Sequence, residues 1–161
     1  MYDLQEIEAI KRLKYKYLRC LDNKLWEEMA ECFLDDATSA YSGGKYSFSG
    51  REEILNFFRE SMSGSHILSS HTVHHPEIDI DSETSATGIW RLEDVFIDDE
   101  NGFAIQGAGW YRDEYRKLDG IWKIKHTGYK RTWEEMVSRK DDAKLTMLQR
   151  WSDPTGASSG I

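Results

Sequence analysis

The amino-acid sequence predicts one α+β domain in which helices come first and a curved antiparallel sheet follows. Three observations point to this class. Apolar residues recur at helical spacing early in the chain, alternation with a period of two begins near residue 67, and turn sequences separate the later runs. Three helices packed in one antiparallel sheet would form a cone-shaped barrel, and a ligand pocket is expected in its open mouth.

Composition limits the classes of partner. The 161 residues suit one domain, and 21 Lys and Arg against 29 Asp and Glu give a formal net charge of −8, without the basic footprint of a nucleic-acid binder. No apolar run approaches the ~18 residues of a membrane span, and the N-terminus lacks the apolar core of a signal peptide. Cys20 and Cys32 have no metal-binding spacing and suit a reducing compartment. We expect a cytoplasmic protein with no nucleic-acid or membrane partner.

The first half of the chain predicts three helices and a hairpin. The first helix spans roughly residues 3–20, and Asn23 can cap a short second helix. A hairpin is expected over residues 38–48. Ser49–Glu52 resembles a capping box that opens the third helix. The residues of the first helix that recur at helical spacing are Leu4, Ile7, Ile10, Leu13, Tyr17 and Leu21.

The second half predicts long strands joined by tight turns. Strands are expected near residues 86–96, 103–117 and 121–131. A single domain over residues 1–136 is therefore followed by a polar tail, residues 137–161. After the last strand we expect a short helix that begins past Trp133, and then disorder.

Tyr17 and Asp22 are the first candidates for chemistry. Tyr17 shares a helix face with Ile10 and Leu13, and Asp22 lies just past the predicted helix end. On spacing alone, Tyr17 could equally be a core aromatic with its hydroxyl at the rim. Asp22 could equally be a turn or capping residue.

Three histidines form the motif His-Thr-Val-His-His-Pro. On a regular strand His71 and His75 point one way and His74 the other. A zinc site needs a convergent third ligand, which no HExxH or CxxC motif supplies, so no metal is expected. A histidine that faces a pocket as an acid or base is favoured instead, because imidazole titrates near neutrality. His66 and His126 are interpreted as surface or structural residues.

Asp94 and Arg131 are the remaining charged candidates. Asp94 shares a strand face with Trp90 and Phe96, where a carboxylate needs a partner unless a bulge turns it outward. Arg131 lies beside Tyr129 near the end of the last strand. It is either a surface cation or a cation at the pocket mouth, suited to an acid or an oxyanion.

Several segments together resemble the SnoaL-like dehydratases, and bacterial bile-acid 7α-dehydratases in particular. The resemblance covers nearly all of residues 5–136. The segments that carry it are Ile7–Lys14, Lys16–Asp22, His71–Ile78, Asp81–Gly88, Trp90–Asp94 and Asp113–Trp122. The hairpin and residues 98–104 depart from the family pattern.

This resemblance implies a set of site residues. The family's catalytic positions fall on Tyr17, Asp22, His71, Asp94 and Arg131. An Asp–His pair such as Asp22 with His71 performs eliminations in the wider superfamily, which includes scytalone dehydratase and lindane dehydrochlorinase. The aromatic residues expected to bind substrate are Tyr41, Trp90, Tyr111 and Tyr129.

The resemblance also implies a function. It suggests a hydro-lyase that removes water from a 3-oxo-4-ene hydroxysteroid of the bile-acid type by acid–base catalysis, without a metal or organic cofactor. The substrate would be a steroid or bile-acid derivative, free or as a CoA thioester, and the protein a homotrimer. Fold alone leaves other functions open. These are a non-catalytic binding protein, a polyketide cyclase, a ketosteroid isomerase and a dehydrohalogenase.

Overall fold

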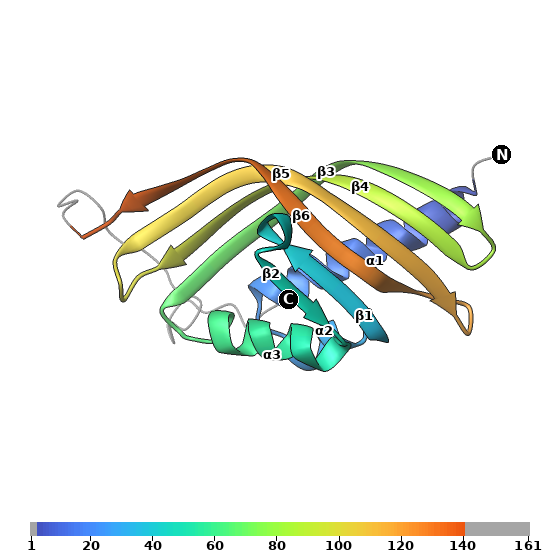
Figure 1. The fold of residues 1–161 in the computed structure, drawn as a ribbon, viewed down its shortest axis with the longest axis horizontal. Helices are drawn as coiled ribbons and strands as arrows, with labels where there is room; N and C mark the ends of the chain where they lie inside the picture. The colour runs from blue at the N-terminus through green and yellow to red at the C-terminus, as the bar shows by residue number, and fades with distance from the viewer. Residues whose placement is uncertain (1–2, 141–161) are drawn as a thin grey trace, which may run out of the picture.

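The computed structural model describes residues 3–140 of the chain. The first half contains α1 (Leu4–Asp22), α2 (Trp26–Ala30), β1 (Phe33–Tyr41), the short 3-10 turn η1 (Ser42–Gly44), β2 (Tyr46–Ser49) and α3 (Arg51–Met62). The second half contains four long strands, β3 (Ile67–Ser82), β4 (Ser85–Asp98), β5 (Phe103–Leu118) and β6 (Ile121–Ser138) (Figure 1).

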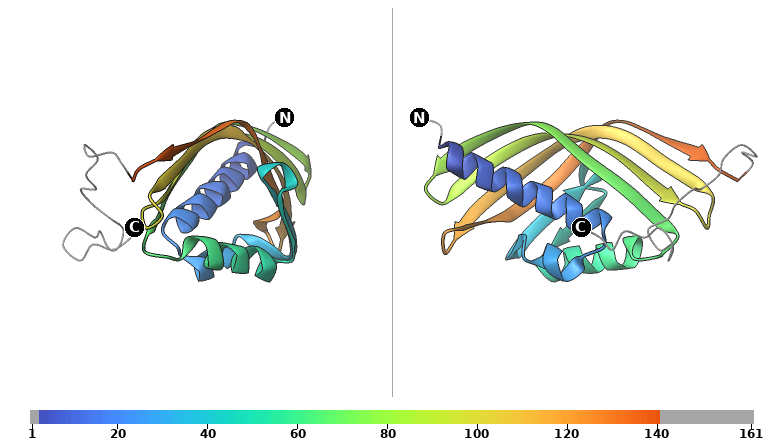
Figure 2. Two further views of the ribbon diagram at one scale, coloured as in Figure 1. Left: turned by 60° about the vertical axis from the view of Figure 1, so that its left-hand side comes forward. Right: turned by 180° about the vertical axis from the view of Figure 1, so that it is seen from behind.

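All six strands form one sheet in the order β2-β1-β6-β5-β4-β3. The sheet curves over α1, while α2 and α3 lie across its open side (Figure 2). The predicted α+β cone is therefore confirmed, with two differences. The described sheet stays open along β2 and β3 instead of closing, and β1 runs parallel to β6 whereas the other pairs are antiparallel. A period of two reveals a strand but not its direction, so the parallel pair could not be predicted.

Both ends of α1 are capped by side chains. The carboxylate of Asp3 accepts the main-chain N–H groups of Gln5 and Glu6 at 3.1 and 3.2 Å. At the other end the amide of Asn23 donates to the carbonyl of Arg19 at 2.9 Å. Asn23 therefore closes α1 and does not open α2, which begins without a side-chain cap.

Two further local predictions differ from the structure: the cap of α3 and the segment after Trp133. Gly50, with a φ of 100°, is the N-cap of α3, a conformation that glycine adopts without strain. The N–H of Ser49 is accepted by Glu53 at 3.3 Å, so the capping interaction reaches one residue beyond the predicted Glu52. At the C-terminal end, residues past Trp133 continue β6 instead of forming a helix, because β5 extends far enough to pair with them. The disorder predicted for the tail lies outside the described residues from position 141 onward.

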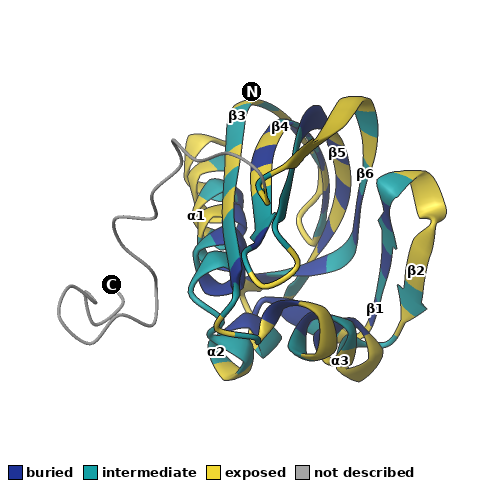
Figure 3. Ribbon diagram, turned by 90° about the vertical axis from the view of Figure 1, so that its left-hand side faces the viewer, coloured by how far each residue is buried: buried dark blue, intermediate teal, exposed yellow. Residues whose placement is uncertain are grey.

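The core lies between α1 and the inner face of the sheet. Along β4 and β5 alternate side chains point inward, and Trp90, Leu92, Tyr111 and Tyr115 are almost fully buried. Figure 3 shows the buried positions on the inner side of the sheet and the exposed ones on its rim and on α3. No helix within residues 3–140 is long and apolar enough to cross a membrane.

Candidate active site

A cavity of about 450 Å³ opens between the concave face of the sheet, α3 and the C-terminal half of α1. Its apolar wall contains Leu21, Phe57, Phe58, Met62, Phe96 and Ile105. Its main polar groups are Tyr17, Tyr41, His71, Asp94, Tyr111, Tyr129 and Arg131. A largely apolar pocket on which a few polar groups converge is typical of a small-molecule site.

His71 is held by Asp22, the last residue of α1. Its Nδ1 lies 2.7 Å from one carboxylate oxygen, and its main-chain N–H donates to the other at 2.8 Å. The hydroxyl of Ser69 donates to the same carboxylate at 2.8 Å. Because a carboxylate accepts, Nδ1 is the donor, and in the neutral ring Nε2 carries the lone pair. Nε2 is thereby the ring nitrogen left to accept a hydrogen bond, and the imidazole lines the cavity although Asp22 itself does not.

Asp94 and Arg131 form a second pair on the sheet. Two guanidinium nitrogens of Arg131 donate to the two carboxylate oxygens of Asp94, one of them at 2.8 Å. Burial disfavours the charged guanidinium, but the bonds to Asp94 outweigh that effect, so the pKa of Arg131 lies above its ordinary value. Oδ2 of Asp94 is 4.0 Å from Nε2 of His71, which places this pair beside the base.

A glycine lets the second pair form across the intervening strand. Asp94 is on β4 and Arg131 on β6, with Gly107 of β5 directly opposite Asp94. A Cβ added at Gly107 would lie 3.1 Å from a guanidinium nitrogen of Arg131 and 2.7 Å from the carbonyl oxygen of Trp133. Glycine within a strand often marks such a close approach.

Four tyrosines line the cavity as a cluster. The hydroxyls of Tyr17 and Tyr41 are 3.3 Å apart, and Tyr129 hydrogen-bonds Ser42 at 3.1 Å. The ring of Tyr111 packs edge-on against that of Tyr129, with centroids 5.4 Å apart. Burial raises the pKa of Tyr17 and Tyr111 well above the ordinary value for a phenol. Tyr17 and Tyr111 therefore stay protonated, and their hydroxyls can donate hydrogen bonds.

Trp90 is placed differently from the expectation for a substrate-binding residue. It is fully buried, its indole N–H donates to the hydroxyl of Tyr115 at 3.0 Å, and it packs against Tyr15 of α1. It does not line the cavity. The strand face on which it lies extends beyond the cavity into the packed core, so sharing a face with Asp94 did not place it at the site.

The other histidines lie away from the cavity. The pairing of β3 with β4 jumps from His74 opposite Arg91 to Glu77 opposite Ile89, and His75 has a φ of 46°. This irregularity leaves His75 exposed, so His75 does not share the face of His71 as predicted. Elsewhere, His126 hydrogen-bonds Thr38 and His66 lies near Glu100. Within residues 3–140 no group of three His, Cys, Asp or Glu side chains could hold a metal ion.

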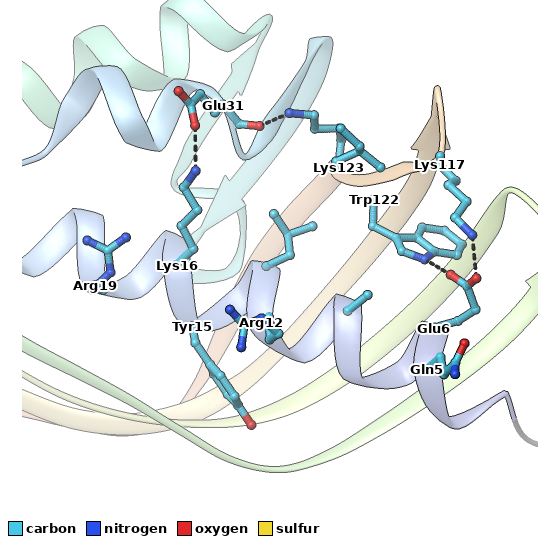
Figure 4. Close-up of a pocket in the computed structure, with 14 residues that line it drawn as sticks. Gln5, Glu6, Arg12, Tyr15, Lys16, Arg19, Glu31, Lys117, Trp122 and Lys123 are labelled. Carbon is cyan, nitrogen blue, oxygen red and sulfur yellow. Dashed lines mark hydrogen bonds and ion pairs between the residues drawn. The ribbon is translucent and has the colours of Figure 1, made fainter.

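A larger groove of about 940 Å³ lies on the outer side of α1 (Figure 4). Both carboxylates that line it are paired with lysines. Lys16 pairs with Glu31 at 2.6 Å, Lys117 pairs with Glu6 at 2.5 Å, and Glu6 also accepts from Trp122. The groove contains no histidine and no fixed base, so we place the candidate site in the smaller cavity.

Known structures of the same shape lie at low sequence identity. A chain from Novosphingobium aromaticivorans DSM 12444 named for scytalone dehydratase is 24% identical with a TM-score of 0.76, covering 89% of this chain and 97% of that one. A hexachlorocyclohexane dehydrochlorinase, LinA-type3 from Novosphingobium barchaimii LL02, is 20% identical with a TM-score of 0.76, covering 91% and 96%. A cystatin-like protein from Nostoc punctiforme PCC 73102 is 18% identical with a TM-score of 0.63, covering 81% and 93%.

These likenesses establish the fold, and a family match goes further. Residues 3–128 match the SnoaL-like domain, a stretch that includes α1, α3, His71 and Asp94 and ends within β6, just before Tyr129 and Arg131. The chain belongs to the SnoaL-like family.

Proposed function

We propose that this protein is a hydro-lyase that removes water from a 3-oxo-4-ene hydroxysteroid of the bile-acid type. One observation carries the proposal: His71, whose tautomer Asp22 fixes, lines a largely apolar cavity that protonated tyrosines also line. A protein that only bound an apolar ligand would not need an oriented base in its cavity. The proposed substrate is a steroid or bile-acid derivative, free or as a CoA thioester, and the reaction needs no cofactor.

The first step of the reaction is removal of a proton from carbon. In a 3-oxo-4-ene steroid with a 7α-hydroxyl, the carbon next to the hydroxylated one is acidified by the conjugated ketone. Nε2 of His71 takes that proton, and the electrons of the broken C–H bond move into a dienolate. The negative charge reaches the ketone oxygen, where a tyrosine hydroxyl of the cavity donates a hydrogen bond.

The second step expels the hydroxyl. The dienolate collapses, a new carbon–carbon double bond forms, and the carbon–oxygen bond breaks. The protonated His71, or Tyr17 as the donor with His71 then restoring its proton, supplies the proton that turns the leaving hydroxyl into water. Arg131, held by Asp94, positions the substrate at the mouth.

An absorbance assay tests this function. The purified protein is incubated with a 7α-hydroxy-3-oxo-4-ene steroid, and we expect the longer-wavelength absorbance of the extended diene to grow with time. The 7-deoxy analogue is the matched control, since it has no group to eliminate. Binding of both steroids without any absorbance change would make the protein a binder and would contradict the proposal.

Elimination of hydrogen chloride is the second candidate, because structures of the same fold include a hexachlorocyclohexane dehydrochlorinase. The same base could remove a proton next to a carbon–chlorine bond. Chloride release from hexachlorocyclohexane, measured beside the steroid assay, distinguishes the two leaving groups. We expect release slower than steroid dehydration, because the tyrosines favour a leaving group that accepts a hydrogen bond.

We also propose that the protein works as a homotrimer. Large apolar side chains remain exposed on β5 and β6, among them Trp110, Trp133 and Met136, and a shallow groove of about 730 Å³ crosses the same strands. Burial of these residues against a second copy would explain their exposure in one chain. Light scattering should give three times the 18.8 kDa of one chain at micromolar concentration, and a monomer would contradict the assembly.

A further inference from the structure

A sealed polar cluster lies directly behind the tyrosines of the cavity. The side chains of Lys14 and Asp113 are both completely buried, and Nζ of Lys14 is 2.7 Å from a carboxylate oxygen of Asp113. That carboxylate also accepts the hydroxyls of Thr127 at 2.7 Å and Tyr115 at 2.8 Å. Burying an ion pair is costly, and apolar residues of the same size often serve stability as well. The cluster therefore calls for an explanation other than stability.

The ammonium of Lys14 faces aromatic rings on its remaining sides. It lies 3.5 Å from the hydroxyl of Thr127, 3.4 Å from the ring centroid of Tyr111 and 5.0 Å from that of Tyr17. Both rings line the cavity. The cation thus lies over the rings of two tyrosines of the cavity, closest to Tyr111.

Tyr111 and Tyr17 differ in what their hydroxyls do. The hydroxyl of Tyr17 is engaged with that of Tyr41, whereas Tyr111 makes no side-chain hydrogen bond to a described residue. Tyr111 is also the closer of the two to the ammonium. It is therefore the tyrosine whose donor remains available to a ligand.

A cation on the face of a phenol ring stabilises negative charge in the ring, so the hydroxyl becomes a stronger donor. Burial at the same time keeps that hydroxyl protonated, because it raises the pKa of Tyr111. Burial lowers the pKa of Lys14, while the carboxylate of Asp113 at 2.7 Å favours its charged form. A protonated donor fixed against this ion-paired ammonium is suited to a charge that appears only during the reaction. In the proposed dehydration that charge develops on the ketone oxygen.

We propose that Lys14 and Asp113 are positioning residues that act through Tyr111 and make its hydroxyl the donor to the oxyanion of the substrate. The inference rests on the proposed function, in which a dienolate forms. It assigns the ketone end of the substrate to Tyr111 and leaves the Tyr17–Tyr41 pair for the hydroxyl that departs.

The first test separates this role from a purely structural one. The paired variant Lys14→Met/Asp113→Asn removes both charges while it keeps the shape of both side chains. We expect kcat for steroid dehydration to fall about 10-fold with little change in KM, because the lost interaction strengthens only as charge develops. Lys11→Met is the matched control, since Lys11 is on the same helix and pairs on the surface with Glu8. A folded paired variant with unchanged kcat would overturn the proposal.

The second test needs no turnover. Para-nitrophenol absorbs visible light only as its anion, so the pKa of the bound probe reports how well the cavity stabilises an oxyanion. We expect the paired variant to raise this pKa by about 1 relative to the wild type. Tyr111→Phe should do the same by removing only the hydroxyl, and it keeps the test valid even if the paired variant does not fold.

The two tests distinguish the two proposals. If the wild type does not dehydrate the steroid but the pKa of the probe depends on Lys14 and Tyr111, the role of Tyr111 as oxyanion donor is supported and the proposed function is wrong. If dehydration occurs while Tyr111→Phe changes neither kcat nor the pKa of the probe, the proposed function stands and this inference fails. A probe that binds to no form of the protein contradicts this inference, while the steroid assay alone decides the proposed function.

Discussion

Two ion pairs with little exposure, both within residues 3–140, differ chiefly in their access to the cavity. Asp94 and Arg131 line it, with 7% and 16% of their side chains exposed, whereas Lys14 and Asp113 lie just behind it with none exposed. Both pairs link segments that are far apart in the chain. Water and ligand can reach only the first pair.

Protein donors surround the sealed pair, Lys14 and Asp113. The open pair, Asp94 and Arg131, lies beside a side chain that can still form a hydrogen bond. Each oxygen of Asp113 has a protein partner. By contrast, Nε2 of His71 lies 4.0 Å from Oδ2 of Asp94 and has no hydrogen-bond partner among residues 3–140. The difference accords with the proposed roles, in which the sealed pair acts through Tyr111 and the open pair faces the substrate.

The largest expected effect is on stability, and it comes from the sealed pair. Asp113→Ala would leave the ammonium of Lys14 buried without its partner, and we expect a loss of about 3–5 kcal/mol of unfolding free energy. Asp94→Ala should cost only about 1–3 kcal/mol, because water in the cavity can solvate Arg131. Urea unfolding followed by circular dichroism measures both. Equal losses would show that the two sites do not differ in solvent access.

The second effect is on turnover, and it comes from the open site. His71→Ala should remove the general base and lower kcat by ~10²-fold or more, while the apolar wall keeps substrate binding nearly intact. Asp22→Asn should also lower kcat strongly, because it weakens control of the tautomer. The double variant should be little worse than His71→Ala alone, since residues that act as a unit are not additive.

His74→Ala is the control for that series. His74 lies on the opposite face of β3, near Glu93, and lines no part of the cavity. It should keep most of the activity. If His74→Ala abolished turnover while His71→Ala did not, the site would lie on the other face of the sheet.

The third prediction concerns Gly107, which leaves room for the Asp94–Arg131 pair. Gly107→Ala would place a methyl group against the carbonyl of Trp133 and the guanidinium of Arg131, at a cost of about 1–3 kcal/mol. Because Arg131 must shift, kcat should also fall, by roughly 10-fold. Steady-state kinetics beside a urea melt would detect both changes. Unchanged kinetics in a destabilised variant would show that the Asp94–Arg131 bond has no part in turnover.

Periodicity predicted the parts of the molecule that depend on local pattern. The apolar stripe of α1 and the alternation in β4 and β5 correspond directly to the faces they bury, so the cone could be predicted. The displaced pairing at His75 could not, because a bulge obeys no period. The prediction that Trp90 binds substrate was wrong for a related reason, since the pattern of a strand face does not indicate where the cavity ends.

One residue of the sealed cluster, Lys14, stands out in the sequence by its position. Lys14 lies between Ile10 and Tyr17 at helical spacing, so a cation stood on the apolar face of the first helix. A charge in that position requires a buried partner. The sequence does not say which of its many carboxylates meets it, because the partner, Asp113, comes from a strand near the other end of the chain. In the same way, the sequence shows Gly107 as a glycine within a strand but does not indicate which side chains meet there.

The smallest effect extends the comparison to an ion pair on the surface. Glu6 accepts from Lys117 and from Trp122 at the rim of the outer groove, and the bond from Lys117 is the main cause that lowers the pKa of Glu6. A carboxylate with a lowered pKa in the folded state adds stability above its unfolded pKa of about 4.3 and loses it as pH falls through the folded value. Glu6→Gln should therefore cost roughly 0.5–1 kcal/mol at pH 7, and the gap to wild type should narrow as the pH falls below the unfolded pKa towards the folded value. Glu8→Gln, which breaks the exposed pair with Lys11, should change unfolding less at either pH. A stability difference that stayed constant down to pH 3 would show that the charge on Glu6 contributes nothing. The contributions of the three ion pairs to stability would then not follow from their exposure alone.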